Sequence, residues 1–135
     1  IAGICLCGFT PQPPHRDIQK TALGATESVD WLYYENTKDA VLALKEQGYK
    51  VFAIEQTKGS ISLENFKTYL SNASNADANN ESNKALAFVF GNEVEGVSEE
   101  VLAICDGAVE IPQYGMKHSL NISVAAAIVL WEMVR

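Results

Sequence analysis

The chain has 135 residues, of which 47% are hydrophobic and 20% charged, a composition typical of one compact globular domain and not of a disordered or fibrous protein. No apolar run approaches the roughly 20 residues needed to cross a bilayer, and the first residues do not resemble a signal peptide, so we expect a cytoplasmic protein without a membrane span. The net charge of −7 argues against bulk attraction to nucleic acid, but residues 1–60 carry 6 basic and 7 acidic residues and leave room for a local basic patch.

The chain has three cysteines, Cys5, Cys7 and Cys105, a small and odd number that does not suit a disulfide framework. We therefore predict that all three are reduced and serve as small buried residues. Because no cysteine or histidine pair has the spacing of metal ligands, we expect no metal site.

The first half of the chain alternates predicted strands and helices. Proline ends the first strand because it cannot donate to a strand ladder, and Asn36 or Thr37 can cap the second helix. In chain order, the predicted elements are a strand over 2–8, a proline-rich loop over 10–14, a helix over 16–23, a strand over 29–34 and a helix over 39–47.

The second half continues the alternation, with one interruption. Residues 71–84 are rich in asparagine, serine and alanine and contain no large apolar residue, so we predict a polar surface loop there. The other predicted strands cover 50–55, 85–90 and 108–111. The predicted helices cover 63–70 and 119–134, and a third helix begins after its capping residue Ser98. This order predicts an α/β fold with a largely parallel sheet flanked by helices.

In such sheets ligands bind at the carboxyl ends of strands, which directs attention to the loops after Glu55, Phe90 and Ile111. The segment GNEVEGVS follows Phe90. Its glycines fit a tight turn, and they also allow close approach to a ligand. The Walker lysine is missing and no GxGxxG occurs, which disfavours a nucleoside triphosphate or dinucleotide site. Acidic residues here would tolerate a cationic ligand such as a sulfonium.

The segment PQYGMKHSLNIS follows Ile111 and leads into the final apolar helix. Free N–H groups at a helix start can bind a ligand, but Ser119 acting as an ordinary helix cap explains the same pattern equally well. His118 has the pKa range of a general base, although a loop histidine is more often a solvated or capping residue.

Two strings together, FVFGNEVEGVS and IPQYGMKHSLNISVAAAIVLWE, resemble the second and third signature motifs of the SpoU (TrmH-like) RNA methyltransferases of the SPOUT superfamily. PPHRDIQKTALGA and FAIEQT resemble the same family. The resemblance implies a C-terminal trefoil knot, a homodimer, and transfer of a methyl group from S-adenosylmethionine to a ribose 2′-hydroxyl of tRNA or rRNA, without a metal.

The resemblance also implies roles for individual residues, mostly through main-chain groups. The positions that match the adenosine-binding residues of the family are Ile54, Glu55, Gln56, Gly91, Ile111, Ser119 and Leu120. Glu93 and Asn121 match the polar wall beside the reacting atoms and are the catalytic candidates. RNA contact is expected from His15, Arg16, Lys20 and Lys117, which could equally be solvated residues.

One part of the family pattern is missing. The first signature motif, with its Asn and the Arg thought to serve in deprotonation, should lie before Ile1. The chain is therefore either a fragment of a longer enzyme, as a start without methionine favours, or a reduced protein. The corresponding alternative function is a non-catalytic S-adenosylmethionine-binding dimerisation module. An unrelated α/β nucleotide-binding domain would require both motifs to match by coincidence.

Overall fold

The computed structural model describes residues 3–8, 29–76, 85–92, 95–113 and 121–135. The contacts within the chain group it into two compact units, Ile1–Ala43 and Leu44–Arg135. The predicted helix over 16–23 lies outside the described residues. The two units are described separately below.

The first unit contains a parallel pair of strands, β1 (Ile4–Cys7) and β2 (Trp31–Tyr34), in the register that pairs Ile4 with Trp31. Both lie within predicted strands. Helix α3 (Thr37–Glu46) starts in this unit, where Oδ1 of Asn36 accepts a hydrogen bond of 3.0 Å from the Asp39 amide. Asn36 is therefore the capping residue of the two candidates.

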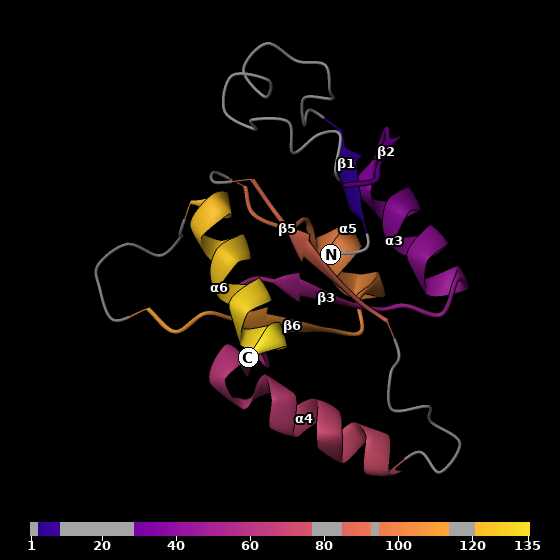
Figure 1. Ribbon diagram of the computed structural model, residues 1–135. Coiled ribbons are helices and arrows are strands. Elements are labelled where there is room, and N and C mark those ends of the chain that lie inside the picture. Colours follow the sequence, from indigo (N-terminus) through magenta and orange to yellow (C-terminus); the bar gives the residue numbers. More distant parts are fainter. Residues whose placement is uncertain (1–2, 9–28, 77–84, 93–94, 114–120) are drawn as a thin grey trace. The chain divides into compact units, whose positions relative to one another are not determined.

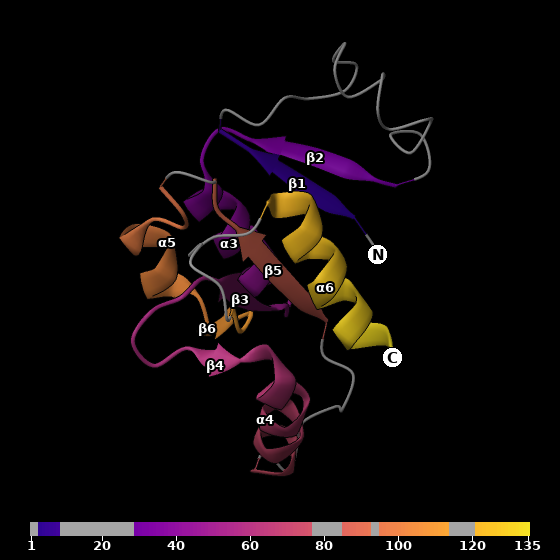
Figure 2. The same ribbon diagram turned by 90° about the vertical axis from the view of Figure 1, so that its left-hand side faces the viewer.

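The second unit is built on a four-stranded parallel sheet with the strand order β4-β6-β3-β5, of which Figure 1 labels β6, β3 and β5 and Figure 2 also labels β4. Strand β3 (Lys50–Ile54) is central and pairs with β5 (Leu86–Phe90) and β6 (Gly107–Glu110), while the short β4 (Ile61–Ser62) pairs with β6. All described strand pairs in both units are parallel, which confirms the predicted sheet type. Strand β4 was not predicted, because a two-residue strand has no periodicity of its own.

Two helices, α4 (Leu63–Ala76) and α6 (Ile122–Val134), pack on the sheet around a common core. Helix α5 (Glu99–Ile104) lies on the opposite side of the sheet from α6, as Figures 1 and 2 show together. The buried residues of this core are Phe52, Leu63, Phe66, Val109 and Val129. The rings of Phe52 and Phe66 meet edge-on in this core, with their centroids 4.9 Å apart.

The amino-terminal ends of β3 and β6 are joined through Asp106. The Val51 amide donates to Oδ2 of Asp106 at 2.8 Å, and the Asp106 amide donates to the Val51 carbonyl at 2.7 Å. Lys45 adds a third link, donating to the Ile104 carbonyl at 2.7 Å with its Nζ 3.8 Å from Oδ1 of Asp106. This reciprocal pair of bonds ties β3 and β6 together at their amino-terminal ends. The predicted site lies at the other, carboxyl-terminal ends of these strands.

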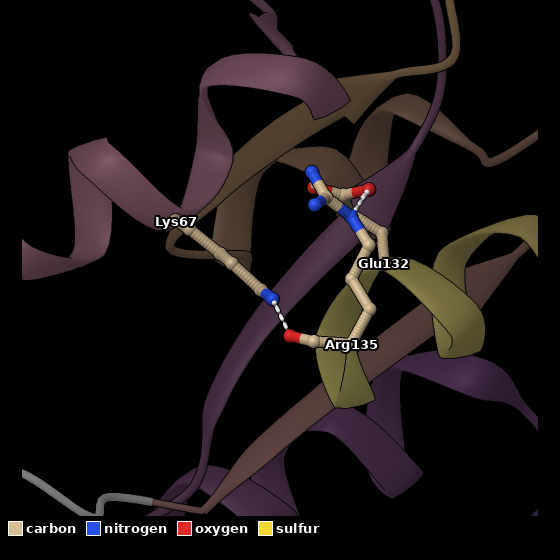
Figure 3. Close-up of polar contacts among 3 residues, drawn as sticks. All are labelled: Lys67, Glu132 and Arg135. Atoms are coloured by element: carbon tan, nitrogen blue, oxygen red, sulfur yellow. Dashed lines mark hydrogen bonds and ion pairs between the residues drawn. The ribbon is translucent and has the colours of Figure 1, made fainter.

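The last turn of α6 also contacts α4 (Figure 3). Nζ of Lys67 donates to the Arg135 carbonyl at 2.7 Å, and the Arg135 guanidinium forms a two-point ion pair with Glu132, at 2.8 and 2.9 Å. Both ends of that ion pair are near water, so its contribution to stability is small.

The structure corrects two predicted boundaries. The predicted loop over 71–84 is wrong for residues 71–76, which continue helix α4, while residues 77–84 lie outside the described part. Once a helix is nucleated, each further residue is added at low cost, and Asn or Ser penalties of roughly half a kcal/mol do not stop it. The predicted final helix begins at Ile122 rather than at Ser119, and its cap is Asn121. No helix of the described residues is long and apolar enough to cross a membrane.

The three cysteines are free, as predicted, but they are half-buried rather than fully buried. Burial raises the pKa of each thiol, and at Cys105 the Asp106 carboxylate adds to the effect. A raised pKa means that the thiolate is harder to form in the folded chain than in the unfolded chain. The free energy of unfolding is therefore unaffected by thiol ionisation below the unfolded pKa, and it falls as the pH rises from that value through the higher folded pKa.

We expect the folded chain to react with iodoacetamide at pH 8 more slowly than the unfolded chain, by roughly threefold to tenfold, because the thiolate is the reactive form. The measurement is the alkylation rate by mass spectrometry, with the same chain in guanidinium chloride as the reference. Equal rates in the two conditions would contradict the described burial of the thiols.

Candidate functional site

The carboxyl ends of the parallel strands bring three predicted site segments to one edge of the sheet. In the register of the sheet, Ile54 at the end of β3 is opposite Phe90 of β5 and Val109 of β6. The residues that follow these strands therefore start side by side. The structure thus brings Ile54, Glu55, Gln56, Gly91 and Ile111 together at this edge.

Glu55 connects the central strand to both of its neighbours. Its amide donates to the Val109 carbonyl at 3.1 Å, which extends the β3–β6 ladder by one bond. Its carboxylate turns the other way: Oε2 accepts a hydrogen bond of 2.8 Å from the Val97 amide, and Oε1 accepts a weaker one of 3.3 Å from the Gln56 amide. The side chain of a predicted adenosine-binding residue is therefore engaged with the protein's own main chain.

The chain after β5 folds back on itself beside Glu55. The Gly96 amide donates to the Asn92 carbonyl at 3.0 Å, and Oδ1 of Asn92 accepts a bond of 2.6 Å from the Glu95 amide. Gly91 lies against the main chain of Gly96 and Val97, so closely that a Cβ at Gly91 would overlap both. We call Gly91, Asn92, Gly96 and Val97 the glycine crossing.

Gly96 is a glycine for two reasons. Its φ is +68°, in the left-handed region that disfavours side chains, and a Cβ there would overlap the Glu55 carboxylate. Val97, the next residue, is 8% exposed and Ser98 after it caps α5, its Oγ accepting from the Val101 amide at 3.3 Å. The described ends of the predicted turn, Asn92 and Gly96, are therefore joined to each other, and Glu55 links this segment to β3 through the Val97 amide.

Asn121 lies at the start of α6, after the segment that follows β6. Its Oδ1 accepts a hydrogen bond of 2.8 Å from the Ser123 amide, so its side chain acts as the helix cap. Ile111, the predicted site residue at the end of β6, is half-buried and packs against the core cluster. Both residues thus have a structural role in addition to the role that the motif implies.

Replacing Asn121 by alanine is expected to lower the free energy of unfolding by about 1 kcal/mol, because the cap bond to the Ser123 amide is lost. Asn121→Ser keeps a capping oxygen and should cost only a few tenths of a kcal/mol. Urea unfolding of the two variants measures the difference. If the serine variant loses as much stability as the alanine variant, the cap is not what Asn121 contributes.

The remaining predicted site residues lie outside the described residues. They are Glu93, Ser119, Leu120, His15, Arg16, Lys20 and Lys117. The described part of the chain contains no group of three His, Cys, Asp or Glu side chains arranged to hold a metal. Sequence reasoning missed Val97, whose amide is a partner of Glu55, because nothing in an apolar residue marks its main-chain bonds.

Comparison with known proteins identifies the family. The model of the SpoU rRNA methylase family matches residues 1–131. The chain belongs to the SpoU family. This confirms the resemblance on which the predicted site rests.

Individual sequence relatives are consistent with this family assignment. The tRNA (guanosine(18)-2′-O)-methyltransferase of Borreliella burgdorferi is 37% identical over 112 residues, 83% of this chain and 45% of that protein. The chain spans about half the length of the curated relatives it matches.

Solved structures share the fold. The TrmH/SpoU tRNA-modifying enzyme of Aquifex aeolicus aligns with a TM-score of 0.74 at 26% identity, covering 97% of this chain and 59% of that one. The AdoMet-bound rRNA methyltransferase of Sinorhizobium meliloti aligns with a TM-score of 0.76 at 24% identity, covering 97% of this chain and 44% of that one. The α/β architecture described above is therefore that of SpoU proteins.

Proposed function

We propose that this chain is the cofactor-binding and catalytic part of an S-adenosylmethionine-dependent RNA methyltransferase that modifies a ribose 2′-hydroxyl of tRNA or rRNA. The observation that carries the proposal is the SpoU family match over residues 1–131, together with a relative named as a tRNA 2′-O-methyltransferase. Because the relatives are named as transferases, a purely non-catalytic module is not favoured.

The main-chain groups at the carboxyl ends of the strands are of the kind that can bind the adenosine part of the cofactor. Adenosine is planar and uncharged, so main-chain N–H and C=O groups from adjacent segments suffice to bind it. Such groups are present at Ile54 to Gln56, at Gly91 and at Ile111, which the register of the sheet sets side by side. We propose that Ser119 and Leu120 complete this set.

S-adenosylmethionine, when bound, would supply the methyl group of its sulfonium and would be released as S-adenosylhomocysteine. The ribose hydroxyl that accepts the methyl group must lose its proton, and the protein must orient it. We propose that Glu93 and Asn121 form the polar wall beside the reacting atoms. We also propose that the intact protein supplies the deprotonating arginine before Ile1, as the family pattern implies.

We further propose that the chain forms the family's C-terminal trefoil knot and a homodimer that works in the cytoplasm, where tRNA and rRNA are found. The homodimer is supported by α6, which leaves large apolar side chains in water. Trp131 is 68% exposed, Val134 77% and Val124 47%. Several exposed large apolar side chains on one helix are typical of an interface. RNA would then meet His15, Arg16, Lys20 and Lys117.

The test is calorimetric titration of the purified chain with S-adenosylmethionine, combined with its solution mass. We expect binding by a dimer. A folded monomer that binds no cofactor would count against the proposal. In the full-length protein, methyl transfer from labelled cofactor to tRNA or rRNA, followed by nuclease digestion, identifies the modified ribose; a label on a base instead of a ribose would overturn the proposed reaction.

A further inference from the structure

We propose that Glu55 is a positioning residue whose carboxylate, through the Val97 amide, fixes the glycine crossing against the central strand and thereby sets the cofactor-facing main chain of Gly91. The inference rests on the proposed function. It assigns the side chain of Glu55 a different task from direct contact with adenosine.

The geometry shows that Glu55 is the direct link from β3 to the crossing. Its amide is held to β6 by the bond to the Val109 carbonyl, so the residue starts from a fixed place. Its carboxylate reaches a main-chain amide that lies 42 residues away in the sequence, at 2.8 Å. A hydrogen bond to an ionised acceptor is stronger than a neutral one, which makes this contact suited to holding a loop.

The crossing transmits that constraint to Gly91. The Glu55 carboxylate lies against Gly96 on one side, and Gly96 lies against Gly91 on the other. The contact of Gly96 with Gly91 involves main-chain atoms, which cannot turn aside. Glu55 contributes the end of its side chain, which is held in place by the hydrogen bond from the Val97 amide. The pairing of Phe90 with Ile54 holds Gly91 from the side of β5. If the bond to Val97 is lost, Gly91 keeps that support but loses the constraint that the crossing adds from the side of Gly96 and Val97.

Two substitutions of Glu55 distinguish the effect of side-chain length from the effect of its negative charge. Glu55→Asp keeps the negative charge but is shorter by one methylene, so it cannot make the Val97 bond from the same backbone position. Glu55→Gln loses the charge but keeps an oxygen at the same reach. A positioning role predicts that the aspartate variant is the more damaged of the two. A direct electrostatic role toward a sulfonium predicts the reverse order.

The experiment measures S-adenosylmethionine affinity by calorimetry and hydrogen exchange of the Val97 amide by NMR, in the whole chain. We expect affinity to fall on the order of tenfold in Glu55→Asp, with faster exchange at Val97, and by about threefold or less in Glu55→Gln. Glu46→Gln is the control, because Glu46 is exposed on α3 and its change removes the same charge. It should leave both quantities unchanged.

The outcomes distinguish this inference from the proposed function. A wild-type chain that binds no S-adenosylmethionine would count against the proposed function. Wild-type binding that persists unchanged in Glu55→Asp would overturn only the role of Glu55, as would a larger loss in Glu55→Gln than in Glu55→Asp. If Glu55→Asp does not fold, the glutamine variant decides: faster Val97 exchange together with weaker binding supports positioning. Faster exchange with unchanged affinity, or a tenfold loss of affinity with unaltered exchange, refutes it.

Discussion

Gly91→Ala is expected to abolish measurable binding of S-adenosylmethionine to this chain. The added Cβ would overlap the main chain of Gly96 and Val97, which can move only if the crossing opens. Forcing a methyl group into a closely packed place costs about 1–3 kcal/mol, and here the displaced atoms belong to the site itself. The measurements are calorimetric affinity and the urea midpoint of unfolding.

The matched control for Gly91→Ala is Gly48→Ala. Gly48 has a φ of +95°, and the methyl group that alanine adds there would meet nothing within 4 Å. Its substitution therefore adds backbone strain without overlap, just before the amino-terminal end of β3 and away from the carboxyl ends of the strands. This variant should lose about 1–3 kcal/mol of stability and keep its cofactor affinity. If Gly91→Ala binds the cofactor as the wild type does, the crossing is not part of the binding site.

Phe66→Ala is expected to cause the largest loss of stability, about 3–5 kcal/mol, because it leaves a cavity in the centre of the core. The Phe66 side chain is fully buried. The centroid of its ring lies 4.9 Å from that of Phe52 and 5.9 Å from that of Phe88. A loss of this size approaches the whole stability of a small domain. Urea unfolding followed by circular dichroism measures it.

Tyr69→Ala on the same helix is the comparison for Phe66→Ala. Tyr69 is 40% exposed, so its replacement removes an aromatic ring from α4 with much less buried surface. Its cost should be less than half that of Phe66→Ala, following the difference in buried apolar area. Similar costs for both variants would show that the core is not centred on Phe52 and Phe66.

Most elements of the fold were predictable because their signals are local. The apolar run that became β5 and the Ser98 cap followed by Glu99 and Glu100 each identify an element within a few residues. The errors have local causes as well. Asn121 competes with nearby serines for the capping position of α6, and intrinsic preference does not choose among them. Strand β4 exists only through its pairing with β6.

The candidate site was predictable in position but not in its internal contacts. Parallel strands predict that the segments after β3, β5 and β6 meet at one edge, and the register confirms it for Glu55, Gly91 and Ile111. No spacing in the sequence relates Glu55 to the Val97 amide, because a main-chain donor carries no sequence signal. The family pattern adds residue roles, whereas the hydrogen bonds show which side chains are already engaged within the protein.

The sheet of the second unit has two ends that are closed in different ways. At the amino-terminal end, Asp106 and Val51 exchange bonds, and Lys45 adds a third link. At the carboxyl-terminal end, closure depends on two glycines and one carboxylate. Substitutions far apart act independently on stability, so a change at the carboxyl-terminal end leaves the bonds among Val51, Asp106 and Lys45 intact. The segments at the carboxyl-terminal end can therefore be altered by substitution without loosening the opposite end of the sheet.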